Sequence, residues 1–102
     1  MFGLSEKNIE SIREVFSHYN EVDSVIIYGS RAKGNYQNGS DIDLTLLGDN
    51  IKLNSCVYNI MEDLDNLDLP YSFDISIFNH IENRDLIEHI KRVGKLFYER
   101  SE

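Results

Sequence analysis

Apolar positions recur along the chain with two different periods. Residues 5–19, 53–67 and 86–93 carry an apolar residue at every third or fourth position. This spacing places the apolar side chains on one face of a helix, so we expect three helices. Ser5 is suited to cap the first helix at its start, and Gly94 to cap the last helix at its end.

Other segments have the pattern of β-strands. Residues 25–28 form a short apolar run, while residues 41–47 and 71–78 alternate between apolar and polar side chains. Alternation gives a strand one face for the core and one polar face. Residues 95–99 either add a closing strand or pack against the core. Helices and strands in alternation predict one α/β domain over residues 1–102, with a small sheet.

The composition excludes several classes of protein. Eighteen acidic and ten basic side chains give a formal charge of −8, which disfavours strong direct binding to nucleic acid and suits a basic protein partner or a metal–nucleotide complex. No apolar run approaches the roughly 20 residues that span a bilayer. The first ten residues lack the pattern of a signal peptide, and a single cysteine cannot form an internal disulfide. We therefore expect a cytoplasmic protein that is not bound to a membrane.

The segment after the first strand has features of an anion-binding loop. A strand that ends in Gly29-Ser30 and turns into a helix presents backbone N–H groups, which can bind an anion. Arg31 and Lys33 add positive charge. The phosphate-loop motif itself is absent, because its Lys and Ser or Thr do not follow Gly34. Taken alone, the loop is better explained by an ordinary strand-to-helix turn with solvated basic side chains.

Three aspartates strengthen the anion-binding interpretation. Asp41 and Asp43 are expected on one strand face, about 7 Å apart, where they would repel each other without a cation. A solvated outer face is the alternative. Asp74 lies on the polar face of another strand, so three carboxylates converge if the strands are neighbours. Carboxylate oxygens suit Mg²⁺, and two such ions promote attack on a phosphate held by the opposite loop.

A family resemblance rests on these residues. Gly29-Ser30, ten intervening residues and then Asp41-Ile42-Asp43 resemble the G-S-x10-D-x-D signature of the DNA polymerase β nucleotidyltransferase superfamily. Over nearly its whole length the short chain also resembles the minimal nucleotidyltransferases, the MNT proteins that pair with HEPN toxins. The resemblance implies an α/β (α+β) polymerase β palm-like fold, with a small mixed β-sheet flanked by helices.

The resemblance also implies roles for individual residues. Asp41 and Asp43 would bind two Mg²⁺ ions, and Asp74 would complete one metal site and help to activate the attacking hydroxyl. Ser30 would hold the β- or γ-phosphate of ATP, with Gly29 allowing the close approach. Weaker candidates for contacts with the triphosphate are Arg31, Lys33 and Ser40.

The function implied by the resemblance is Mg-dependent transfer of a nucleoside monophosphate, AMP from ATP, to a hydroxyl of a partner protein. The similarity to MNT antitoxins points to a HEPN-type helical toxin encoded nearby. Two alternatives stay open: an antitoxin that neutralises its partner by steric binding, and a nucleotidyltransferase that acts on a small molecule or an RNA end. An acceptor-binding domain does not fit in 102 residues, so the acceptor would come from a partner chain. Whether the assembly is a homo- or hetero-oligomer stays open.

Overall fold

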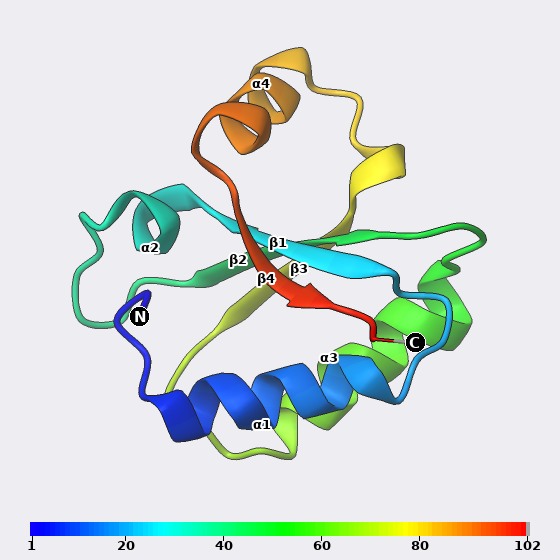
Figure 1. Cartoon of the computed structure of the whole chain (residues 1–102), viewed down its shortest axis with the longest axis horizontal. Coiled ribbons are helices and arrows are strands. Elements are labelled where there is room, and N and C mark those ends of the chain that lie inside the picture. The colour runs from blue at the N-terminus through cyan, green and yellow to red at the C-terminus, as the bar shows by residue number, and fades with distance from the viewer. Residues whose placement is uncertain (102) are drawn as a thin grey trace.

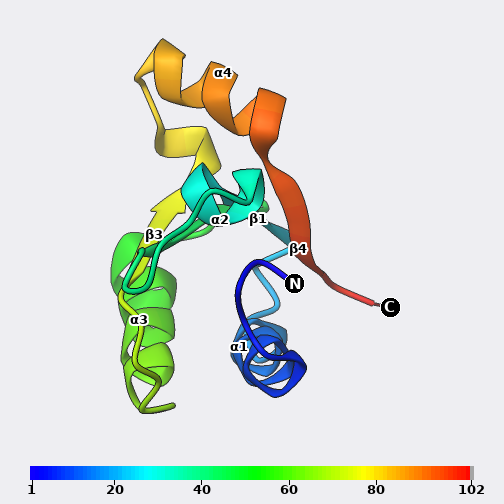
Figure 2. The same cartoon turned by 90° about the vertical axis from the view of Figure 1, so that its left-hand side faces the viewer.

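The computed structural model describes residues 1–101 as a four-stranded sheet with helices on both faces (Figures 1 and 2). The helices and strands expected from the periodicity are all present, and residues 95–99 form a strand. In chain order the elements are α1 (Glu6–Ser17), β1 (Ser24–Tyr28), α2 (Gly29–Lys33), β2 (Ile42–Leu47), the π-helical turn η1 (Leu53–Val57), α3 (Tyr58–Asp65), β3 (Phe73–Ile77), the 3-10 turn η2 (Phe78–His80), α4 (Arg84–Val93) and β4 (Lys95–Glu99).

The sheet is mixed, as expected. Its strand order is β3-β2-β1-β4; β1 is antiparallel to β2 and β4, whereas β2 and β3 are parallel. A parallel pair needs a crossover, which η1 and α3 provide. Because β2 and β3 run in the same direction, their first residues lie at the same end of the sheet.

The hydrophobic core lies between the sheet and the helices α1 and α3. Figure 2 shows these two helices on one side of the sheet and α4 on the other. Ile27 and Leu44 are partners in neighbouring strands, and both are fully buried, as are Ile12 and Phe16 of α1 and Ile60 of α3. The opposite side chains of the strands therefore face α2 and α4. None of the helices within residues 1–101 is long and apolar enough to cross a membrane.

Of the two capping residues expected from the sequence, one has the usual conformation and the other does not. The Ser5 hydroxyl accepts a hydrogen bond from the Asn8 N–H at 3.1 Å, so Ser5 caps α1 as expected. Gly94 ends α4, but in an extended conformation (φ −63°, ψ 147°) rather than the left-handed one common for such glycines. A Cβ on Gly94 would overlap the Ile90 carbonyl and approach the Ile26 side chain. Gly94 is therefore required by close packing between α4 and the sheet.

The second helix differs from the single helix expected over 53–67. Its first turn is the π-helical η1, in which the N–H groups of Cys56 and Val57 both donate to the Lys52 carbonyl. The α-helix ends at Asp65, and residues 66–68 form turns. Cys56 is fully buried, and burial raises the pKa of its thiol to about 11, so this side chain is a core residue.

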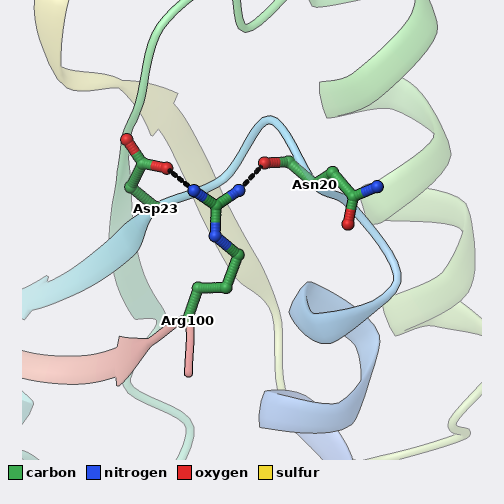
Figure 3. Close-up of polar contacts among 3 residues, drawn as sticks. All are labelled: Asn20, Asp23 and Arg100. Carbon is green, nitrogen blue, oxygen red and sulfur yellow. Dashed lines mark hydrogen bonds and ion pairs between the residues drawn. The ribbon is translucent and has the colours of Figure 1, made fainter. Parts of the chain in front are cut away.

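Arg100 fastens the end of β4 to the connection between α1 and β1 (Figure 3). Its side chain lies 2.7 Å from the Asp23 carboxylate and donates to the Asn20 carbonyl. Its backbone N–H donates to the Asp23 carbonyl, and the Asp23 N–H donates to the Leu47 carbonyl. The ends of β4, β1 and β2 are thus joined at one end of the sheet, which leaves the other end for the polar residues described next.

Candidate functional site

The acidic residues lie at one end of the sheet, on the face that α4 covers in part. Tyr28, the last residue of β1, is the partner of Asp43 in β2, and Asp43 is the partner of Asp74 in β3. Side chains of directly opposite residues lie on the same face. The structure therefore brings Asp43 and Asp74 together, as the two alternating patterns led us to expect.

Asp41 lies beside this pair, outside the strand. β2 begins at Ile42, so Asp41 precedes the strand instead of sharing its face, and its side chain is exposed. Burial raises the pKa of Asp43 above its ordinary value, and the charges of Asp74 and Asp41 raise it further. Asp41 and Asp74 thus lie near enough for their charges to act on Asp43.

The negative charge of this group is not balanced by the protein. The only ion pair among residues 1–101 joins Arg100 and Asp23, far from Asp43. Within the same residues, no three His, Cys, Asp or Glu side chains are gathered in the geometry of a metal site. The donor set is nevertheless of the hard oxygen type that Mg²⁺ prefers. The three carboxylates therefore have the right chemistry for a divalent cation, although they are not arranged around a common centre.

Gly29 forms the turn from β1 into α2 and lies directly against Asp43. Its φ of +73° is in the left-handed region, which favours glycine. A Cβ at this position would overlap Oδ2 of Asp43 and lie 3.3 Å from its Cγ. Only glycine therefore allows this carboxylate to approach the turn, and Ser30, the next residue, is held close to the acidic group.

The other residues expected at the triphosphate have different surroundings. Ser30 is half-buried in the first turn of α2, and Lys33 is exposed at the end of that helix. The Ser40 hydroxyl accepts a hydrogen bond from the Gln37 N–H at 2.9 Å, so it closes the turn before Asp41. Ser30 and Lys33 therefore keep the exposure that a substrate contact needs, whereas Ser40 has a partner in its own loop.

Arg31 is not the solvated side chain that the sequence suggested. It is only 3% exposed, and its guanidinium donates to the backbone carbonyls of Ser40 and Phe2. The rings of Tyr36 and Tyr71 lie against the guanidinium. The sequence could not show this, because two of the partners, Phe2 and Tyr71, come from distant parts of the chain. The Arg31 guanidinium is therefore not available for contact with the triphosphate.

Sequence reasoning missed Tyr28. This side chain is buried; burial raises its pKa, the Ser76 hydroxyl lowers it, and the charges of Asp74 and Asp43 raise it again. The ring of His89, on α4, packs edge-on against Tyr28 with 6.2 Å between the ring centroids. The available signal was a tyrosine at the end of an apolar strand, directly before the Gly-Ser turn.

We expect Asp43→Asn to raise the melting temperature at neutral pH by a few degrees at most when EDTA removes divalent cations. Because the pKa of Asp43 is raised by folding, the folded state loses stability as the pH rises from the ordinary value of Asp, about 3.9, through the raised value. Asparagine carries no such charge, so the difference should disappear as the pH falls toward about 4. Melting curves at both pH values, with the exposed Asp49→Asn as control, measure this; a lower melting temperature for Asp43→Asn at pH 7 contradicts it.

Comparison with protein families gives a match over almost the whole chain. Residues 10–102 match the family described as "Polymerase beta, Nucleotidyltransferase". Comparison with curated protein sequences gives no match.

Several solved structures have the same fold. A crystal structure of a toxin–antitoxin with AMP-PNP contains a chain with 19% identity and a TM-score of 0.74, the match covering 92% of this chain and 75% of that one. The toxin–antitoxin MntA–HepT gives 16% identity and a TM-score of 0.67, covering 93% and 73%. A structure of the tri-AMPylated Shewanella oneidensis HEPN toxin in complex with MNT antitoxin gives 16% identity and a TM-score of 0.68, covering 94% and 73%. At these identities the similarity is one of fold.

Proposed function

The chain belongs to the polymerase β nucleotidyltransferase family, and on that premise we propose that it transfers AMP from ATP to a hydroxyl group of a partner protein. The observation that carries the proposal is the pair of Asp43 and Asp74 in neighbouring strands, with the Gly29-Ser30 turn pressed against Asp43. The carboxylates provide ligands for a metal ion, and the turn lets a phosphate approach the backbone closely. Together they form a site for a metal-bound triphosphate.

The three aspartates, Ser30 and Lys33 each have a role in this proposal. Asp41, Asp43 and Asp74 hold Mg²⁺, which supplies charge neutralisation of the phosphates and a lower pKa for a nearby hydroxyl. Ser30 donates a hydrogen bond to a β- or γ-phosphate oxygen. Asp74 also orients the acceptor hydroxyl and accepts its proton, while the hydroxyl oxygen forms a bond to the α-phosphorus, the bond to the bridging oxygen breaks and pyrophosphate leaves. Lys33 is a secondary contact for the triphosphate.

The partner is proposed to be a HEPN-type toxin. Proteins of the same fold are found in a toxin–antitoxin with AMP-PNP and in a complex of MNT antitoxin with a tri-AMPylated HEPN toxin. This chain carries a formal charge of −8, and acidic side chains on and after α3, among them Glu62, Asp65 and Asp68, are exposed. Such a surface attracts a basic partner, whereas it repels an RNA acceptor.

An antitoxin that neutralises its partner by steric binding is the alternative function. The observation in its favour is that no three potential metal ligands are gathered together within the described part of the chain. A protein that only binds has no need for Asp43 and Asp74 to lie side by side, where the charge of Asp74 adds to the electrostatic cost of ionising Asp43. We therefore prefer catalysis.

We expect the double variant Asp41→Asn, Asp43→Asn to lose transfer by at least about 100-fold, because two of the three carboxylates are removed. The test incubates the purified HEPN partner with Mg-ATP and each protein, and then determines the mass of the partner. The wild type should add one AMP or more, and Asp49→Asn, which removes an exposed carboxylate just after β2, should behave as the wild type does. Full transfer by the double variant, or by the wild type in excess EDTA, would show that the proposed site is wrong.

A further inference from the structure

We propose that Arg31 is a positioning residue for this site, which holds Asp41 and the start of β3 in place without touching the nucleotide. The inference rests on the proposed function, because that function gives Asp41 and Asp74 their importance. Its structural basis is independent of that function, since it consists of the contacts of one buried guanidinium with three separate segments of the chain.

The first segment is the loop that leads to Asp41. Nε and Nη2 of Arg31 both donate to the Ser40 carbonyl, at 3.1 and 3.0 Å. This carbonyl belongs to the peptide group whose nitrogen is that of Asp41. On the other side of Asp41, the Ile42 N–H donates to the Ser72 carbonyl at 2.9 Å. Asp41 is exposed and outside the strand, yet its backbone is held on both sides, and one of the two restraints is Arg31.

The second segment leads to Asp74. The ring of Tyr71, just before β3, lies 5.0 Å from the guanidinium carbon of Arg31, within the range of a cation–π interaction. The ring of Tyr36, from the loop between α2 and β2, lies 5.3 Å from the same atom. Arg31 itself follows Ser30 directly in α2. One guanidinium therefore connects the helix that carries Ser30 with the segments that carry Asp41 and Asp74.

The third segment is the N-terminal turn, which covers the guanidinium. Nη1 of Arg31 donates to the Phe2 carbonyl at 3.0 Å. A Cβ on Gly3 would lie 3.0 Å from Nη1 and even closer to the Tyr36 ring. With Arg31 only 3% exposed, these groups leave a phosphate no room to approach the charge.

Burial makes the arrangement specific. Removing a cation from water is costly unless hydrogen bonds and aromatic faces replace the water, and here the replacements are two carbonyls and two rings. These groups compensate for the lost hydration of the guanidinium only when all three segments are in place. Lysine cannot reproduce the contacts, because it lacks the planar group that donates through two nitrogens and stacks on rings.

Arg31→Lys therefore tests the inference, with Arg13→Lys as the matched control. Arg13 also donates to a backbone carbonyl, that of Phe97, and lies over its ring, but it joins α1 to β4. We expect Arg31→Lys to lower transfer to the HEPN partner by about 10- to 100-fold, the loss typical of misplaced reacting groups. Hydrogen exchange of the backbone over residues 34–42 should become faster. Arg13→Lys should change neither measurement.

A second pair of variants covers the case in which Arg31→Lys does not fold. Tyr71→Leu removes one ring from the guanidinium and should speed exchange over residues 34–42 and lower transfer several-fold, whereas Tyr71→Phe keeps the ring and should match the wild type. Near-normal transfer and unchanged exchange in Arg31→Lys or Tyr71→Leu overturn the inference, as does a loss of transfer without faster exchange, which indicates direct contact with substrate. If the wild type itself transfers nothing, the proposed function fails, and the exchange measurements still decide whether Arg31 holds the loop.

Discussion

Gly29→Ala should lower nucleotide transfer by about 100-fold or more, because the new methyl group would displace a carboxylate of the site. The Cβ would overlap Oδ2 of Asp43, so either the turn or Asp43 must move. The residue also has a φ of +73°, where alanine is strained by roughly 1–2 kcal/mol. Transfer to the partner at saturating Mg-ATP measures the first effect, and the melting temperature measures the second.

Gly34→Ala is a control that separates the two effects of Gly29→Ala, the backbone strain and the overlap of the new Cβ with Asp43. Gly34 follows α2 with a φ of +88°, and a Cβ there would have no atom within 4 Å. The alanine therefore meets the same backbone strain without a collision. Similar losses of stability in both variants, with a large loss of transfer only in Gly29→Ala, are the expected result. Equal transfer by both variants would mean that the close approach of Gly29 to Asp43 has no part in catalysis.

Asp74→Asn should lower transfer by about 100-fold or more while the protein still binds its partner, a loss typical of removing a metal ligand or a general base. Asp74 is exposed at the start of β3, opposite Asp43, and asparagine has the same shape, so the fold should persist. Binding of Mg-ATP should be largely retained, since Asp41 and Asp43 remain.

The same variant distinguishes catalysis from steric neutralisation. The partner is incubated with Mg-ATP and with either the wild type or Asp74→Asn. It is then separated from that protein under denaturing conditions and refolded, and its mass and its activity are measured. Catalysis predicts added AMP and lasting inactivation after treatment with the wild type only. A partner that recovers full activity from the wild type without added mass would establish steric binding as the function of this pair.

The Asp43–Asp74 pair could be foreseen because alternation in a strand is a local property. In each strand the residue after the aspartate is apolar and points to the other face. Leu44 is buried and Ile75 half-buried in the core, which fixes the face of the aspartates. Parallel pairing of the two strands then brings the carboxylates together. The sequence could not indicate that β2 starts after Asp41, because the Ile42 N–H donates to the carbonyl of the distant Ser72. The π-helical first turn of the second helix was not foreseen either, because apolar spacing does not distinguish it from an α-helical turn.

The surroundings of Arg31 could not be foreseen for a different reason. A basic residue in a polar loop is normally solvated, and its burial here depends on Phe2 and Tyr71, which lie far from it in the sequence. Tyr28 was missed because an aromatic residue at the end of an apolar strand reads as a core residue. Its hydroxyl gains significance only once Asp43 and Asp74 are placed beside it.

The place of β4 in the sheet has a consequence for the order of events during synthesis. β1 is central, and one of its two neighbours is β4, which follows the other three strands in the sequence and is fastened by Arg100 (Figure 3). While the ribosome is still adding that strand, β1 and β2 can pair, but β1 retains an open edge. Pairing between distant segments is slow, and open edges favour aggregation. The nascent chain is therefore exposed to misassembly through this edge of β1 until β4 has been synthesised and has paired with it.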